Sequence, residues 1–253
     1  MNLCIIQARM GSTRMPGKVL RDANGKTILQ NIVDRISPAK LVDEMVVATS
    51  NNPEDNAIEK FCAENKIRCS RGSDWDVLDR FYQTAISFSP APENIIRICC
   101  DNPLHGHREV DFVIGEFLKL GVDYFSNSNH EPHFLEDGFD TEVFSFRALE
   151  YAWREAKMLS EREHVTPFIK QCGKFKCGWR KANALYHFKL SVDTENDFLV
   201  SQIIFKELGN DTDFGITEVV DLILKKPELL EFNKESIINE GYRKSLREDR
   251  RVN

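Results

Sequence analysis

The chain begins MNLCIIQARMGSTRMPGKVL (residues 1–20), in which a short apolar run leads into a segment rich in cations and glycine. Residues 3–7 have the apolar character of a buried strand. The first three cations of the chain, Arg9, Arg14 and Lys18, follow this run before any acidic residue occurs. In open α/β sheets, ligands bind at the carboxyl ends of the strands. The stretch therefore predicts a buried strand of an α/β sheet with an anion-binding loop at its carboxyl end.

The chemistry of this loop suits phosphate groups. Gly11 and Gly17 allow the backbone to turn and to approach a ligand closely. Consecutive backbone N–H groups, together with the Ser12 hydroxyl, can surround phosphate oxygens. The loop is not a P-loop, because five residues separate the two glycines and Val19 follows Lys18 in place of a hydroxyl residue. A solvated basic loop without a ligand is the alternative interpretation.

Apolar periodicity alternates between strand and helix through the first half of the chain. This alternation predicts an α/β fold with a mostly parallel sheet, right-handed crossovers and helices on both faces. We expect strands at residues 3–7, 45–49, 67–70, 94–100 and 123–128, and helices at residues 28–36, 54–62, 77–86 and 110–118.

The alternation breaks between about residues 130 and 186, which we interpret as an inserted smaller sub-domain. The sheet pattern returns with a strand in YHFKLSVDT (residues 186–194), followed by a helix. Residues 1–225 are therefore expected to form one domain that contains the inserted segment. Residues 226–253 are expected to form a C-terminal extension, whose charged end after Asn239 should be loosely held.

Composition excludes several classes of protein. A formal net charge of −6 over 253 residues argues against a nucleic-acid partner, which would require a basic face. No apolar run approaches the ~20 residues of a membrane span, and the early arginines interrupt any signal peptide. Seven scattered cysteines without a CxxC pair indicate reduced thiols in a cytoplasmic protein.

Two aspartates are expected at the same edge of the sheet. Asp101 directly follows the strand NIIRICC (residues 94–100), and Asp193 lies at the end of the strand in YHFKLSVDT. Two such carboxylates could share Mg²⁺, which prefers oxygen ligands and bridges to phosphate oxygens. Each aspartate also precedes a predicted helix, so a helix cap is the alternative for either one.

Six segments, in order along residues 1–225, carry a family resemblance. The segment QARMGSTRMPGKVL resembles the amino-terminal signature of SpsF-type cytidylyltransferases of spore-coat polysaccharide biosynthesis, and is similar to that of the enzymes that activate 3-deoxy-octulosonate and sialic acid with CTP. The resemblance implies a Rossmann-like, GT-A-like nucleotidyltransferase fold. It continues through SRGSDWDVLDRF (70–81), RICCDNPL (97–104), DGFDTEVFSF (137–146), EREHVTPF (161–168) and LSVDTENDF (190–198).

The resemblance implies transfer of CMP from CTP to a sugar, with an acidic sugar favoured, and release of pyrophosphate for surface polysaccharide synthesis. Such chemistry depends on positioning and electrostatics. The implied partners are CTP and the sugar acceptor, and a homodimer formed through the inserted segment. The implied catalytic residues are Lys18, Arg9, Asp101 and Asp193, of which Asp101 and Asp193 hold Mg²⁺.

The resemblance also places the two substrates. Three of the residues named below also have a structural alternative. Arg71 could form a salt bridge, Asp76 could cap a helix, and His164 could be a structural histidine or a subunit contact. The implied nucleotide-binding residues are Ala8, Gly11, Ser12, Arg14, Thr49, Arg71 and Asp76. The implied acceptor-binding residues are Asn127, Glu142, Arg162 and His164.

Three alternative functions stay open. A GT-A glycosyltransferase would usually carry D-x-D after a strand, whereas this chain has Asp101, Asn102 and Pro103 there. A sugar-1-phosphate nucleotidylyltransferase is the second alternative. A binding module without activity would not need both Asp101 and Asp193.

Ser191 stands where sialic-acid-type enzymes often carry a further aspartate, so a second metal ion is not implied.

Overall fold

The computed structural model describes residues 1–128, 137–180, 188–209 and 213–252. In these residues seven strands form one sheet, in the order β3-β2-β1-β4-β6-β5-β7. The pairs β1·β2, β1·β4, β2·β3 and β5·β7 are parallel, whereas β6 runs antiparallel to both β4 and β5. The strands are β1 (Asn2–Gln7), β2 (Glu44–Ser50), β3 (Cys69–Gly72), β4 (Asn94–Cys99), β5 (Tyr124–Ser126), β6 (Glu142–Ser145) and β7 (Cys177–Trp179).

The opening apolar run becomes the central strand of the parallel half. Ile5 is fully buried and pairs with Val46 of β2 on one side and with Arg97 of β4 on the other. A strand buried on both faces needs apolar residues at consecutive positions, which explains its uninterrupted apolar sequence. The predicted α/β fold with a mostly parallel sheet is confirmed.

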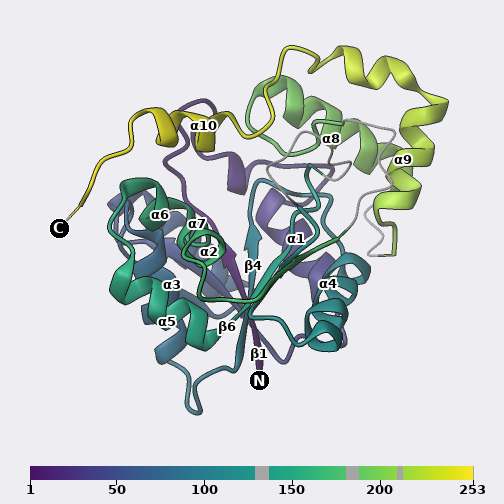
Figure 1. Ribbon diagram of the computed structural model, residues 1–253. Coiled ribbons are helices and arrows are strands. Elements are labelled where there is room, and N and C mark those ends of the chain that lie inside the picture. Colours follow the sequence, from purple (N-terminus) through teal and green to yellow (C-terminus); the bar gives the residue numbers. More distant parts are fainter. Residues whose placement is uncertain (129–136, 181–187, 210–212, 253) are drawn as a thin grey trace.

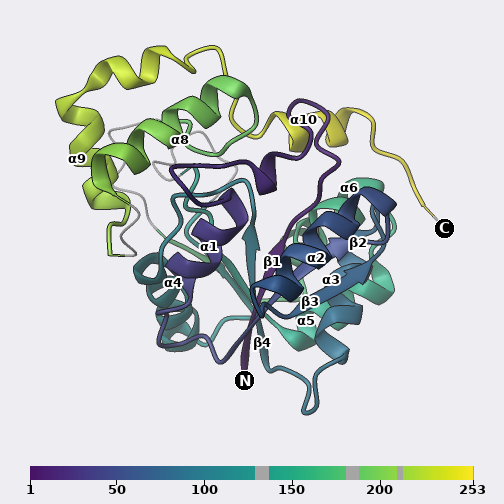
Figure 2. The same cartoon turned by 180° about the vertical axis from the view of Figure 1, so that it is seen from behind.

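Helices cover both faces of the sheet (Figures 1 and 2). Side chains of α1, α2, α4, α8 and α9 pack in one apolar cluster, and side chains of α3, α5 and α7 pack in a second cluster on the other face. The α-helices are α1 (Ile28–Ile36), α2 (Asn56–Glu64), α3 (Val77–Ile86), α4 (His107–Leu120), α5 (Phe146–Glu155), α6 (Leu159–His164), α7 (Pro167–Gln171), α8 (Glu195–Leu208), α9 (Ile216–Lys225) and α10 (Glu240–Arg247); the 3-10 helices are η1 (Lys18–Leu20), η2 (Pro53–Asp55) and η3 (Pro227–Glu231).

Helix α1 shows how local sequence sets an element. The Thr27 side chain accepts a hydrogen bond from the Gln30 N–H at 3.0 Å, so it satisfies one of the free donors at the helix start. The apolar residues that follow at helical spacing are buried in the first cluster. The helix covers the residues that the periodicity predicts, Ile28–Ile36.

Two expectations about the last third of the chain are wrong. Residues 188–194, the described part of YHFKLSVDT, form no strand. The end of the C-terminal extension is not loosely held, because it forms α10 and docks on α6. Figure 1 shows α10 above the carboxyl ends of β1 and β4.

The described part of the segment 130–186 contributes β6 and β7 to the sheet and α5, α6 and α7 to the side of the molecule. Its assignment as an inserted sub-domain, the domain boundaries and the homodimer stay predictions. Within the described ranges, no helix combines the length and the apolar character that crossing a bilayer requires.

Candidate functional site

The loop after β1, residues 8–17, is fixed by backbone contacts. The Gly17 N–H donates to the Met10 carbonyl at 2.9 Å, and Gly17 has a left-handed φ of 71° that glycine adopts without strain. The Met10 N–H in turn donates to the buried Asp55 carboxylate of η2 at 2.6 Å. These contacts hold the loop over the sheet edge and deliver Lys18 at the start of η1.

Lys18 lies between the two predicted metal-binding aspartates. Its Nζ atom is 3.6 Å from Asp101 Oδ2 and 3.2 Å from Asp193 Oδ1, and it donates to the Val192 carbonyl at 2.5 Å. The Val192 N–H also donates to the Asp101 carbonyl at 2.7 Å, which ties the two aspartate segments together. The structure therefore brings together three residues that the sequence predicted to share one site.

Cations dominate the surroundings of Asp193. Burial raises the pKa of its carboxyl, but Lys18, Lys189 and Arg14 outweigh burial and hold the pKa at about 2. Asp193 is therefore ionised at neutral pH, and a carboxylate in that state can interact with further cations.

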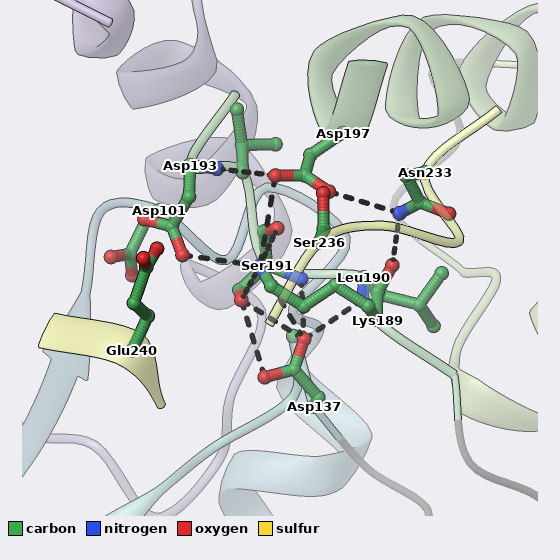
Figure 3. A network of polar contacts seen from close by, with 12 residues as sticks. Asp101, Asp137, Lys189, Leu190, Ser191, Asp193, Asp197, Asn233, Ser236 and Glu240 are labelled. Carbon is green, nitrogen blue, oxygen red and sulfur yellow. Dashed lines mark hydrogen bonds and ion pairs between the residues drawn. The ribbon is translucent and has the colours of Figure 1, made fainter. Parts of the chain in front are cut away.

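Asp137 positions the segment that carries Asp193. Its carboxylate accepts hydrogen bonds from the backbone N–H groups of Leu190 and Ser191, each at 2.9 Å (Figure 3). The close approach depends on Gly138, where a Cβ atom would lie 2.7 Å from Leu190 Cβ. Side-chain hydrogen bonds thus replace the strand pairing that the sequence predicted here.

Lys189 is the centre of a buried charge network (Figure 3). Its Nζ atom donates to Ser191 Oγ at 2.6 Å and to Asp193 Oδ2 at 3.1 Å, with Asp197 Oδ2 at 3.8 Å and Asp137 Oδ2 at 4.0 Å. Burial lowers the pKa of Lys189, but the three carboxylates outweigh burial and raise it. The network keeps Asp193 in one orientation, with Oδ2 toward Lys189 and Oδ1 toward Lys18.

These residues open onto a cleft of about 680 Å³ above the carboxyl ends of β1 and β4. The cleft is large enough for a nucleotide and a small second substrate. The predicted site residues that line it are Ala8, Arg9, Ser12, Arg14, Lys18, Asp101, Glu142, His164 and Asp193.

The loop side chains at the cleft form weak contacts with the rest of the protein. Arg9 is half-exposed and pairs with Asp74 at 3.3 Å. The Ser12 hydroxyl accepts a hydrogen bond from the Met15 N–H at 3.3 Å. An exposed arginine in such a pair can exchange its carboxylate for a ligand at small cost, because exposed ion pairs contribute little to stability.

Arg14 is shared between two carboxylates. Its guanidinium lies 3.0 Å from Asp193 Oδ1 through one nitrogen and pairs with Glu240 of α10 through the other. Glu240 and Asp101, both labelled in Figure 3, line the same cleft. Glu240 thus places a third carboxylate at the cleft and occupies a cation that a phosphate group could otherwise bind.

The segment that carries Glu240 is anchored at its far end. The Asp249 carboxylate accepts from the Ser160 N–H at 2.9 Å and from the Ser160 hydroxyl at 2.7 Å. The Val252 N–H donates to the Lys157 carbonyl at 2.7 Å. The segment is thus attached to Arg14 at Glu240 and to Ser160 and Lys157 near its other end. Between these contacts, residues 238–248 form one wall of the cleft.

Arg71 and Thr49 were expected to bind the nucleotide, but neither lines the cleft. The Arg71 guanidinium donates to the carbonyls of Ser50 and Asn52, each at 2.9 Å, and pairs with Glu59 at 2.8 Å. Thr49 is fully buried in β2. Arg71 therefore ties β3 to η2 and α2, and the salt-bridge alternative describes its place better.

Asp76 and Arg162, expected on the nucleotide and acceptor sides, bind each other outside the cleft. Arg162 Nη2 lies 2.6 Å from Asp76 Oδ2, and Arg162 Nη1 donates to the Trp153 carbonyl at 2.7 Å. Asp76 also caps α3 by accepting from the Asp79 N–H at 2.9 Å. This pair fixes α3 against α6, so the helix-cap alternative for Asp76 is confirmed.

Asn127 and Gly11 also lie off the cleft surface. Asn127 is buried, donates to the Phe139 carbonyl at 2.8 Å and accepts from the Thr141 N–H at 2.8 Å. These contacts join the end of β5 to the segment before β6. Gly11 is exposed and belongs to the loop beside Ser12.

Glu142 and His164 reach the cleft with their polar groups already bound. Glu142 pairs with Arg97 and accepts from the Tyr124 hydroxyl at 2.6 Å. Burial raises the pKa of Glu142, but Arg97 and the other partners hold it well below its usual range. His164 Nε2 is hydrogen-bonded to Ser245 of α10 at 2.9 Å. Both residues therefore shape the wall between α6, β6 and α10.

Several residues that line the cleft, and Lys189 behind it, escaped the sequence analysis. Asp140 lines the cleft, and burial together with Asp137 raises its pKa to about 7. Lys189 had one available signal, because it interrupts an apolar run four residues before Asp193. The other residues carry no local signal, since only the tertiary structure places them. The missed residues are Arg80, Arg97, Asp137, Asp140, Lys189 and Glu240.

Asp101 and Asp193 fit a divalent cation chemically. In the part of the chain that the structure describes, Asp101 Oδ1 has no hydrogen bond or ion pair, so this oxygen is uncommitted. That same part holds no group of three or more His, Cys, Asp or Glu side chains suited to a metal ion. Further ligands would come from phosphate oxygens and water, as is usual for Mg²⁺.

Comparisons with known proteins agree with this geometry. Residues 3–237 match the family model described as Cytidylyltransferase. The chain is 35% identical over 246 residues to an uncharacterized protein of Methanocaldococcus jannaschii, with 94% of this chain and 96% of that protein covered. It is 29% identical over 238 residues to the spore coat polysaccharide biosynthesis protein SpsF of Bacillus subtilis, with 89% and 95% covered.

A solved structure is also similar over nearly the whole chain. A cytidylyltransferase from Leptospira borgpetersenii superposes with a TM-score of 0.83 at 26% sequence identity, covering 90% of this chain and 96% of that one. The matches confirm the resemblance that the sequence motifs indicated.

Proposed function

The chain belongs to the cytidylyltransferase family, and we propose that it transfers CMP from CTP to an acidic sugar and releases pyrophosphate. The observation that carries this proposal is the position of Lys18 between Asp101 and Asp193, beneath a loop that presents Arg9 and Arg14. Cations and carboxylates at one point of a cleft suit a triphosphate bound together with a metal ion.

The cations of the loop would bind the leaving group. Pyrophosphate departs with additional negative charge, and fixed positive charges stabilise that charge in the transition state. Lys18 is held nearly rigid because it is only 8% exposed and has three oxygen neighbours. Arg9 and Arg14 are more exposed and would exchange Asp74 and Glu240 for phosphate oxygens.

Asp101 and Asp193 would hold Mg²⁺, which supplies charge neutralisation at the phosphate groups when it is bound. Asp193 is ionised and oriented by Lys189, and Asp101 keeps one carboxylate oxygen uncommitted. The protein thus provides two oriented oxygen ligands without a dedicated cage. This arrangement suits an ion that arrives with the nucleotide.

The acceptor would lie in the part of the cleft between α6, β6 and α10. The walls there are polar and include His164, Glu142 and Tyr242. The acceptor hydroxyl oxygen would form the new bond to the α-phosphorus as the bond to pyrophosphate breaks, and the hydroxyl proton would pass to water. An acidic acceptor is favoured by the resemblance of the loop to enzymes that activate 3-deoxy-octulosonate and sialic acid.

A substrate panel tests the proposal. Each of CTP, UTP, GTP and ATP is incubated with Mg²⁺ and with sugar acids, neutral sugars or sugar 1-phosphates, and pyrophosphate release is measured. A parallel reaction supplies a CMP-sugar in place of the nucleotide, and its consumption is measured. We expect release with CTP and a sugar acid. Release only with a sugar 1-phosphate would contradict the acceptor class, and consumption of a CMP-sugar without pyrophosphate release would instead indicate a glycosyltransferase.

A further inference from the structure

Arg80 of α3 is buried in the cleft wall and has no carboxylate partner among the residues that the structure describes. Its side chain is 2% exposed, yet Arg80 is among the residues that line the cleft. The guanidinium has one hydrogen bond within the described residues, from Nη1 to the Ser73 carbonyl at 3.0 Å, and its Nε has no acceptor there. A guanidinium carries five N–H donors, so most of its capacity is unused.

Two other arginines, the buried Arg35 and the partly buried Arg97, have the usual set of partners. Arg35 donates to the carbonyls of His105 and Leu104 at 3.1 Å and 2.9 Å and stacks on the Phe214 ring. Arg97 donates to Gln7 at 3.0 Å and pairs with Glu142. Buried charges are normally paired or fully hydrogen-bonded in this way, so Arg80 stands apart.

Close packing of α3 against β3 fixes the position of Arg80. A Cβ atom on Gly72 would lie 2.9 Å from Arg80 Cγ and 3.2 Å from its Cα, so only glycine lets α3 approach β3 here. Asp74 and Asp55 attract the guanidinium without contacting it: Asp74 pairs with Arg9, and Asp55 binds the Met10 N–H, so neither outweighs the cost of burial. Burial, followed by repulsion from Arg9, lowers the pKa of Arg80 to about 10.

We infer that the Arg80 guanidinium binds an anionic oxygen of a ligand in the cleft, either a phosphate oxygen of the nucleotide or a carboxylate oxygen of the acceptor. The inference rests on the proposed function for the identity of these ligands. The geometry behind it is a buried cation that no described carboxylate contacts and that lies in the wall of a cleft lined by further cations. A ligand oxygen would supply the acceptor that the described part of the chain does not provide.

The inference predicts that replacement of Arg80 affects ligand binding and protein stability differently. An unpaired buried charge destabilises the ligand-free protein. Arg80→Met keeps the length of the aliphatic stem and removes the charge. The variant should therefore melt at the same temperature as the unmodified protein or at a higher one, whereas a purely structural arginine would lower the melting temperature when removed.

Ligand binding should change in the opposite direction. A charge-assisted hydrogen bond contributes enough that its loss weakens binding by about tenfold or more. Arg80→Lys retains the charge without the fork and should lose less than Arg80→Met. Arg108→Met is the matched control, because Arg108 is an exposed arginine that pairs with Glu218 at 3.2 Å and does not line the cleft.

The experiment measures melting temperature, the Kd for CTP with Mg²⁺, and the KM and kcat for the acceptor. A weaker Kd for CTP assigns Arg80 to the nucleotide, and a raised acceptor KM with unchanged CTP binding assigns it to the acceptor; either supports the inference. Unchanged binding of both substrates by Arg80→Met, with the unmodified protein active, would overturn it. Failure of the unmodified protein to bind CTP would instead refute the proposed function.

Discussion

The Lys18 Nζ atom lies 3.2 Å from Asp193 Oδ1, although 175 residues separate them in the chain. The contact joins the loop after β1 to the segment before α8, and Asp101 at the end of β4 completes it at 3.6 Å. The cleft is thus assembled from three distant parts of the sequence around one ammonium group.

Replacement of Lys18 should abolish most turnover. Lys18→Met removes the cation placed between two carboxylates, and loss of one such group typically costs about 10²-fold or more in kcat. Pyrophosphate release at saturating CTP and acceptor measures the effect. Lys26→Met is the control, because Lys26 pairs with Asp34 at 2.6 Å away from the cleft. Near-normal kcat in Lys18→Met would contradict the assignment.

Removal of the Glu240 charge should strengthen nucleotide binding. In Glu240→Gln, Arg14 no longer has to exchange a carboxylate for a phosphate oxygen. Because the pair is partly exposed, the gain is modest, about two- to fivefold in the Kd for CTP. Titration of CTP with Mg²⁺ measures it, with Glu235→Gln as control, because Glu235 is exposed and does not line the cleft. A weaker affinity in Glu240→Gln would show that the glutamate assists binding instead.

Loss of Lys189 should destabilise the fold. Lys189→Met leaves the carboxylates of Asp137, Asp193 and Asp197 without their shared cation in a buried place. Breaking a buried ion pair on one side costs about 3–5 kcal/mol in the free energy of unfolding. Denaturant titration measures the change, and Lys234→Met, which removes an exposed cation, should cost little. A loss below about 1 kcal/mol would contradict the role of the network.

The parts of the site that follow strand ends could be predicted from sequence. The apolar run of β1 and the strand before Asp101 fixed the edge at which the loop and Asp101 meet, because buried parallel strands carry consecutive apolar residues. Asp193 was placed correctly for a wrong reason. Its segment is held by hydrogen bonds to Asp137 and by Lys189, not by strand pairing.

Orientation of polar side chains could not be predicted. Arg71, Arg162 and Asn127 lie near the correct edge, but backbone carbonyls and Asp76 take their hydrogen bonds. Sequence patterns place a residue on an element, whereas its partner depends on how neighbouring elements pack. The position of α10 has the same origin, because Asp249 binds Ser160 across 89 residues.

Acid should weaken the fold partly through His105. Burial lowers the pKa of His105 to about 4, and the ring is hydrogen-bonded to Thr141 at 2.7 Å. Because its pKa is lower in the folded state than the unfolded value of about 6.5, its contribution is complete above that pH and is lost as the pH falls toward 4. The loss amounts to about 3 kcal/mol at pH 4.

The measurement compares denaturant titrations of the unmodified protein and His105→Gln between pH 7 and pH 4. The glutamine variant should lose less stability over this window, because it has no ring to protonate. Parallel slopes for the two proteins would show that His105 does not contribute.

A structure of the protein with Mg²⁺ and a slowly reacting CTP analogue tests the central claim most directly. We expect phosphate oxygens at Lys18 and Arg14, the cation at Asp101 and Asp193, and Glu240 displaced from Arg14. A triphosphate bound away from Lys18, or a cation that contacts neither aspartate, would contradict the account.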